Sequence, residues 1–205
     1  LPNGWHHLVA VGDVTKTTFY VNGANVGESS LISGLPVDVI GGRMSKNELF
    51  ADKLDEFRIY SSSLTPFEVS ELYGNGDGDF GGHPYQDGPP SFDNRPKIQL
   101  PIMPLAHWTF NENNGTALGD ASGNENNGTL EGFDDPENAR VAGKTGLGLH
   151  FDGFDDTVKV DSKSRFNLSG PFSVALWAKT SDLKAELLSS YQFILEIEDG
   201  FVRGK

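Results

Sequence analysis

The sequence predicts an all-β protein built as an antiparallel β-sandwich, and three observations support this fold class. The hydrophobic fraction is only 37% and the chain contains 25 glycines, a composition typical of short strands joined by many turns. Several segments show the period-two alternation, or the β-branched and aromatic content, of strands. Only one segment has the pattern of a capped helix. With 205 residues, the chain has the length of one sizeable domain or two small ones.

The first part of the chain contains four predicted strands, at residues 6–11, 17–21, 37–40 and 54–60. Asn22-Gly23 follows the second of these and predicts a tight hairpin, because both turn residues must adopt positive φ. In the fourth, Leu54, Phe57 and Ile59 obey the period of two only in part.

One short helix is predicted at residues 66–73. Thr65 is a suitable N-cap, Pro66 occupies the first helical position, and Glu68 completes a capping box. Gly74 ends the helix with a residue that tolerates the left-handed conformation.

Regular patterning disappears at residues 75–104, a stretch rich in Pro, Gly and Asp. A segment of about 30 residues is longer than an ordinary loop in a compact domain and predicts a linker. Fully extended, it could reach on the order of 100 Å. This reach would let the flanking parts close on each other within the chain, or let each be completed by a neighbouring copy.

The last part of the chain again has the pattern of an antiparallel sandwich. Residues 172–178 form a clear period-two strand, and a hairpin is predicted around Asp199-Gly200. Residues 111–127 form a polar loop. The other predicted strands are at residues 107–110, 148–151, 157–160, 193–197 and 201–203.

Two sets of segments carry a family resemblance. In residues 1–74 they are Trp5 to Val11, Phe19 to Gly23, Asp55 to Tyr60 and Leu64 to Val69, and in residues 105–205 they are Trp108 to Gly115, Asp120 to Asn124, Phe151 to Asp156 and Phe172 to Trp177. The first set resembles the C-terminal half, and the second set the N-terminal half, of laminin-G-like domains of the concanavalin A-like lectin/glucanase and pentraxin group of jelly rolls. The resemblance implies an antiparallel jelly roll that includes sugar binders, adhesion modules and structural spacers among its relatives.

The order of the two halves departs from the family, in which a strand such as Asp199 to Arg203 is followed, after a short turn, by one such as Gly4 to His7. The halves are therefore expected to be permuted, or to be completed by neighbouring chains or adjacent tandem repeats. A head-to-tail contact of that kind closes into a ring or continues as a filament. Since the chain begins at Leu1 and shows no signal peptide, we expect it to be a fragment or a processed product.

The charge balance is strongly acidic, with 29 Asp and Glu against 16 Lys and Arg and a formal net charge of -13. Such a surface would repel nucleic acid. It suits a calcium-binding protein, or one that is simply soluble outside the cell. The absence of cysteine excludes disulfides and thiolate metal sites, and no apolar run is long enough for membrane insertion.

The best candidate metal site is the loop containing Asp120, Ser122, Asn124 and Asn126. Oxygen-bearing side chains at alternate positions are typical of calcium loops, and the resemblance implies calcium where such a loop meets the sandwich. Asp55 or Glu56 is expected to supply a further carboxylate. The alternative is a turn whose side chains only cap their own backbone.

Further acidic groups are weaker candidates. Asp152, Asp155 and Asp156 could hold calcium or simply shape a turn, and Asp77 with Asp79 lies in a glycine-rich run that is costly to order. Related jelly rolls include glycoside hydrolases, which need paired carboxylates on one strand. Glu196 and Glu198 offer two, but Gly200 and Phe201 stand where a third would be expected.

These observations predict a non-catalytic adhesion or structural module, secreted or at the cell surface, stabilised by calcium and assembling through other copies of itself. The first alternative is a carbohydrate-binding module of a secreted multidomain protein, with glycans as its ligands. The second is a glycoside hydrolase.

Overall fold

The computed structural model describes residues 3–30, 36–41, 52–74, 103–160, 166–167, 170–180, 184–190, 194–198 and 201–204. We refer to residues 3–74 as the first half and to residues 103–204 as the second half. The first half contains β1 His6–Gly12, β2 Thr17–Val21, β3 Ala24–Ser29, β4 Pro36–Ile40, β5 Lys53–Tyr60 and α1 Pro66–Gly74. The second half begins with β6 Ala106–Trp108, β7 Ala117–Leu118, β8 Gly128–Glu131, β9 Arg140–Ala142 and β10 Leu147–His150. It continues with β11 Thr157–Val160, β12 Phe166–Asn167, β13 Phe172–Lys179, β14 Lys184–Ser190, β15 Ile194–Glu198 and β16 Phe201–Gly204.

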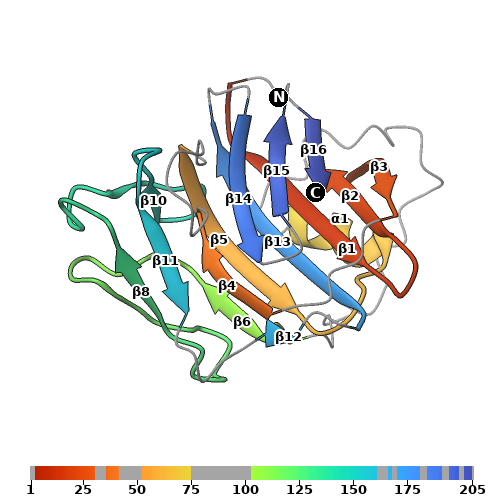
Figure 1. The fold of residues 1–205 in the computed structure, drawn as a ribbon, viewed down its shortest axis with the longest axis horizontal. Coiled ribbons are helices and arrows are strands. Elements are labelled where there is room, and N and C mark those ends of the chain that lie inside the picture. Colours follow the sequence, from red (N-terminus) through yellow and green to blue (C-terminus); the bar gives the residue numbers. More distant parts are fainter. Residues whose placement is uncertain are drawn as a thin grey trace, which may run out of the picture.

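The strands form two antiparallel sheets, which confirms the predicted sandwich (Figure 1). Sheet A has the order β3-β2-β1-β13-β5-β10-β9, with β6 paired to β5. Sheet B has the order β16-β15-β14-β4-β11-β8-β7, with β12 paired to β4. Both sheets therefore combine strands of the two halves, and the halves close on each other within this chain.

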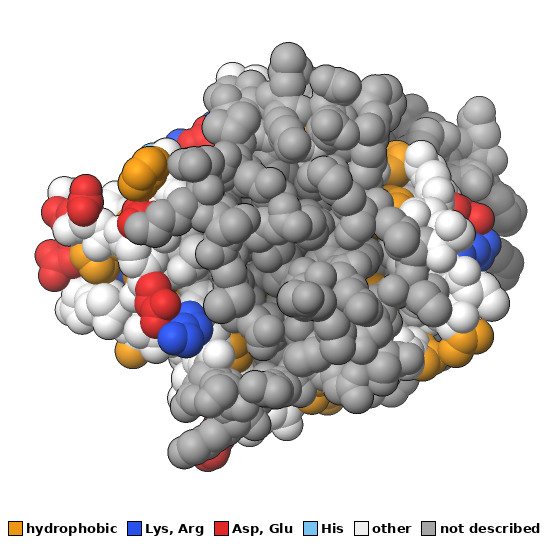
Figure 2. Space-filling view, in the orientation of Figure 1, with side chains coloured by type: hydrophobic (Ala, Val, Ile, Leu, Met, Phe, Trp, Pro, Cys, Tyr) orange, Lys and Arg blue, Asp and Glu red, His pale blue; other side chains and the backbone are white. Residues whose placement is uncertain are grey.

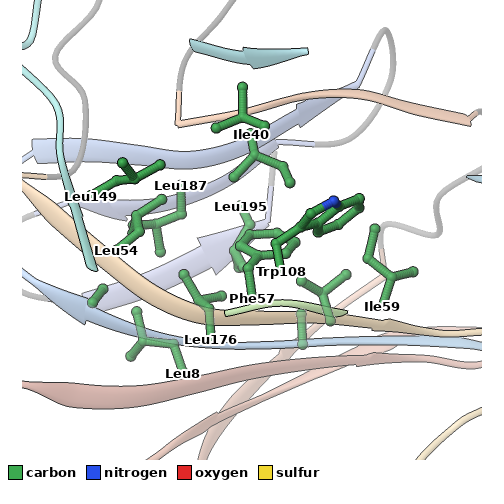
Figure 3. Close-up of a cluster of buried hydrophobic side chains, with 14 of the residues drawn as sticks. Leu8, Ile40, Leu54, Phe57, Ile59, Trp108, Leu149, Leu176, Leu187 and Leu195 are labelled. Atoms are coloured by element: carbon green, nitrogen blue, oxygen red, sulfur yellow. The ribbon is translucent and has the colours of Figure 1, made fainter. Parts of the chain in front are cut away.

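The two inner faces meet in one hydrophobic core to which both halves contribute. Figure 3 shows Ile40, Leu187 and Leu195 of sheet B opposite Leu54, Phe57 and Leu176 of sheet A. These six side chains are fully buried. Because each sheet presents an apolar inner face, burial of that face against the other sheet is the main term that favours folding.

The hairpin predicted at Asn22-Gly23 joins β2 to β3, and the two turn residues have φ of 50° and 79°. Positive φ at both positions matches the right-handed twist of the strands and suits Asn-Gly. The Asn22 side chain adds a tie to β1, because its Oδ1 accepts the backbone N–H of His7 at 3.0 Å.

A β-bulge interrupts β5 at Glu56, which has φ of 53°. On the neighbouring strand the register shifts between Ala175 and Trp177. The extra residue turns both Leu54 and Phe57 toward the core although they are three positions apart. The bulge therefore explains why this strand departs from period two.

The helix α1 covers the outer face of sheet A. Thr65 and Glu68 form the predicted capping box: Glu68 N–H donates to Thr65 Oγ1 at 3.3 Å, and Thr65 N–H donates to Glu68 Oε2 at 2.7 Å. Val69 anchors the helix in a second apolar cluster with Val9 and Ala175. This cluster also joins the halves, since Ala175 belongs to β13.

Some strands were not expected from the sequence. β7 interrupts the segment predicted as a polar loop, and β8, β9, β12 and β14 had no predicted counterpart. Three of these elements span only two or three residues, too few to show a period. These short strands form because neighbouring strands offer them hydrogen-bond partners.

Truncating a buried valine of β13 should destabilise the fold strongly. Val174 has an exposed fraction of 0% in the shared core, so Val174→Ala is expected to lower the free energy of unfolding by roughly 2 kcal/mol. Val26 of β3 is 53% exposed and provides the matched control. Val26→Ala should change the free energy of unfolding by less than about 0.5 kcal/mol. Urea denaturation measures both, and equal losses would contradict the assignment of the core.

Candidate functional site

The loop predicted to bind metal folds around one backbone carbonyl, that of Leu105. Ser122 Oγ donates to this oxygen at 3.2 Å, Asn124 Nδ2 at 3.1 Å and Asn126 Nδ2 at 2.7 Å. Asn124 Nδ2 also lies 3.4 Å from the carbonyl oxygen of Pro104. The structure thus brings the predicted residues of the loop together at the start of the second half.

Asp120 organises this loop from within. Its Oδ1 accepts the backbone N–H groups of His107 and Ser122, and its Oδ2 accepts the N–H of Asn126 and the hydroxyl of Ser122. Burial alone would raise the pKa of Asp120, but these hydrogen bonds outweigh it and hold the pKa below its ordinary value. The carboxylate is therefore charged and already well coordinated by donors.

Glu56 is linked to the loop at Asp120 through His107. Its Oε2 lies 2.7 Å from His107 Nε2 and also pairs with Arg58, while the backbone N–H of His107 donates to Asp120. Burial tends to raise the pKa of Glu56, but the bond to His107 and the charge of Arg58 hold it below its ordinary value. Glu56 is thus connected to the loop by one intervening residue rather than facing it directly.

Asp55 binds a different segment of the chain from the loop at Asp120. Its Oδ2 accepts the backbone N–H groups of Lys144 at 2.7 Å and Thr145 at 2.8 Å, tying β5 to the turn before β10. Its Oδ1 is buried without a hydrogen-bond partner among the described residues. Burial raises the pKa of Asp55 to about 6. The bulge at Glu56 separates the two carboxylates, either of which was expected from the sequence to serve the loop at Asp120.

The second acidic group, Asp152, Asp155 and Asp156, does converge. One potential ligand atom from each residue lies within 4.8 Å of the others. Asp156 is nearly buried, and its Oδ2 accepts the N–H of Asp152 at 2.9 Å. Burial raises the pKa of Asp156 to about 6. On the face drawn in Figure 2, described acidic side chains gather toward the side that carries β8, β10 and β11 in Figure 1.

A buried polar row on the outer face of sheet A was not predicted from the sequence. His7, Trp177 and Asp55 are cross-strand neighbours on β1, β13 and β5. The His7 ring lies 5.2 Å from the Trp177 ring and 6.1 Å from that of Tyr73, and both its nitrogens lack a partner among the described residues. Burial, with a smaller contribution from the charge of Arg58, lowers the pKa of His7 to about 3, so this ring is neutral.

The adjacent histidines point to opposite faces, as the strand geometry of the sequence requires. His6 Nδ1 lies 3.1 Å from Asn22 Nδ2, whereas His7 stacks beneath Tyr73. Trp108 and Trp177 are both buried. The side chains of Glu196 and Glu198, together with Asp77, Asp79 and Asp199, lie outside the described residues.

Comparison with known proteins supports the superfamily. Residues 1–70 match a laminin G family model that is described as the concanavalin A-like lectin/glucanases superfamily. The match lies within the first half, so the reversed order of the halves stays a prediction. The chain has no significant match among the curated proteins or among the solved structures. Within the described ranges, no helix is long and apolar enough to cross a membrane.

Replacing Asp55 with asparagine should flatten the dependence of stability on pH. Burial raises the pKa of Asp55 from 3.8 to about 6, so its contribution to stability is complete below pH 3.8 and is lost as the pH rises through 6. The amide introduced by Asp55→Asn cannot titrate, and it would keep an acceptor for Lys144 and Thr145. Urea denaturation of both proteins from about pH 4 to about pH 7 measures the difference in slope.

The control is Asp13→Asn. Its hydrogen bonds with Thr15 lower the pKa of Asp13, so this residue influences stability at lower pH and should leave the slope in the same range unchanged. Parallel pH curves for the native chain and Asp55→Asn would show that Asp55 does not carry the shift.

Proposed function

We propose that this protein is a non-catalytic carbohydrate-binding or adhesion module that works outside the cell. The observation that carries the proposal is the match of residues 1–70 to the concanavalin A-like lectin/glucanases superfamily, in a chain folded as an antiparallel sandwich. The superfamily contains both sugar binders and structural modules, so the match does not choose between them. The acidic balance of the chain, with a net charge of -13, suits an exposed module better than one that binds nucleic acid.

The non-catalytic form of this proposal draws support from the carboxylates of β5. Asp55 is buried and bound to backbone N–H groups, and Glu56 is paired with His107 and Arg58. Both carboxylates are thus engaged with other residues of the sandwich, whereas a glycoside hydrolase needs a pair that flanks the scissile bond. A glycoside hydrolase is therefore the less favoured alternative.

Binding to immobilised glycans tests whether the ligand of this module is a sugar. A glycan array probed with the full chain should show binding to a defined set of sugars if the module is a lectin, and no release of reducing sugar from the bound glycans. Absence of any bound glycan would favour the adhesion form, in which the ligand is a protein surface. Hydrolysis of a bound glycan would overturn the non-catalytic assignment.

Calcium is proposed at the loop around Leu105. A half-turn of the Asn124 and Asn126 amides would place their oxygens beside the Leu105 carbonyl and Ser122 Oγ, which lie 3.2 Å apart. Asp120 would supply the charge, since its Oδ2 is 2.8 Å from Ser122 Oγ. Calcium takes six to eight oxygens at roughly 2.3–2.6 Å and accepts carbonyls and amides, so these residues would supply five of its ligands. Its role would be to hold the loop against the start of the second half.

Calcium should raise the melting temperature of the native chain, and a chelator should reverse the increase. Asp120→Asn should lower calcium affinity by at least about 10-fold, because it removes the carboxylate that carries the charge of the proposed site. Asp135→Asn is the matched control, since Asp135 also accepts N–H groups of its own loop, from Glu137 and Asn138. Isothermal titration and thermal melts measure both. Equal calcium responses in the two variants would place the ion elsewhere.

Self-assembly is the second part of the proposal, with copies of the chain or adjacent tandem repeats as partners. The observation that favours it is the interleaving of the halves, because the same strand pairs can form within one chain or between two. Repeated between successive copies, such pairing would produce a head-to-tail filament.

A further inference from the structure

We infer that two copies of this chain exchange halves, the first half of one copy completing both sheets with the second half of another. The inference deepens the self-assembly part of the proposed function and does not depend on calcium or glycans. The partner is a second copy of this chain, and the joint is the pairing of β13 and β4 with the opposite half.

The strand pairs supply the first argument. Among the described residues, β4 pairs with β11, β12 and β14, and β5 pairs with β6, β10 and β13, all of the second half. Conversely, β13 pairs with β1 and β5, both of the first half. Each half on its own would leave a central strand without neighbours, and unpaired strand edges bind another strand readily.

The polar ties between the halves supply the second argument. Ser173 Oγ accepts the N–H of Leu64 at 2.9 Å and donates to the carbonyl of Ser62 at 2.9 Å. Asp55 binds the N–H groups of Lys144 and Thr145, and Leu105 N–H donates to the carbonyl of Ile59 at 2.7 Å. All these groups are buried or partly buried in the joint, so each half without its complement would leave them unsatisfied.

The connection between the halves supplies the third argument. One covalent segment, after Gly74 and before Met103, joins them, and its sequence is rich in Pro and Gly. For a linker of this length, as the sequence predicts, the effective concentration of the other half would be on the order of 1 mM. Closure within the chain therefore dominates in dilute solution. Exchange becomes competitive when the chain refolds at comparable concentration.

Cysteine trapping tests the exchange, because the native chain contains no cysteine. Lys53 of β5 lies opposite Lys179 of β13, and these positions belong to different halves. Chains carrying Lys53→Cys and chains carrying Lys179→Cys are unfolded, mixed, refolded at high concentration and oxidised. Exchange should produce a disulfide-linked heterodimer as the main oxidised product, because the two cysteines meet only when β5 of one chain pairs with β13 of the other.

The matched control uses a pair within one half. Glu131 of β8 lies opposite Thr157 of β11, both in the second half, so exchange of halves leaves these strands in the same chain. A mixture of Glu131→Cys and Thr157→Cys chains should give at most background crosslinking. The double variant with both Lys53→Cys and Lys179→Cys, refolded in dilute solution, should form its disulfide within one chain.

Light scattering of the native chain after concentrated refolding provides an independent readout. Exchange should give species at multiples of the 22.2 kDa chain mass that have the circular dichroism of the folded monomer. A single 22.2 kDa species after concentrated refolding, with no heterodimer above the control, would overturn the inference. Since neither readout involves calcium or glycans, that result would leave the rest of the proposed function standing.

Discussion

The pairing of β13 with β1 on one side and β5 on the other is the interaction on which the rest of the structure depends. Its seven register partners on β1 and its further partners on β5 join the two halves along the middle of sheet A. The inner face of β13 supplies Val174 and Leu176 to the shared core, and its outer face supplies Ala175 to the cluster under α1. Removing this strand would therefore expose two apolar clusters and split sheet A.

The bulge at Glu56 lets β5 carry two charged side chains, Asp55 and Glu56, without losing its contacts in the core. The extra residue keeps Leu54 and Phe57 in the core while it directs Asp55 toward Lys144 and Thr145 and Glu56 toward His107. Both contacts cross from the first half to the second. The bulge thus converts two adjacent carboxylates into two separate ties between the halves, and it leaves Asp55 in a buried position that favours its protonated form.

The loop around Leu105 lies where the second half begins, next to the strand pair that joins it to the first. Leu105 N–H donates to Ile59 of β5, while its carbonyl receives the side chains of Ser122, Asn124 and Asn126. Leu105 is thus hydrogen-bonded to residues of both halves. An ion at this loop would act on the join between the halves, which connects the calcium proposal with assembly through the same strands.

The sequence by itself determined the fold class and the local structure. The Asn22-Gly23 turn, the capping box of Thr65 and Glu68 and the strand at residues 172–178 were all predicted and are all present. These features depend on neighbours in the chain: positive φ at a turn, a side chain reaching the next turn of a helix, or a period of two along one strand. The four polar residues of the loop at Asp120 were grouped for the same reason, since they belong to one short segment, and a metal at this loop stays a prediction.

The tertiary structure alone decided which strands lie side by side and where the isolated polar groups go. Short strands such as β7, β9 and β12 exist because a longer neighbour offers them hydrogen bonds, and no local pattern marks them. The separation of Asp55 from Glu56 depends on a bulge opposite Ala175 and Trp177, which come from the other half of the chain. The buried position of His7 likewise depends on Trp177 and Tyr73 covering it. Strand register and the burial of these polar side chains depend on residues far apart in the sequence, so only the packing of the two halves determines them.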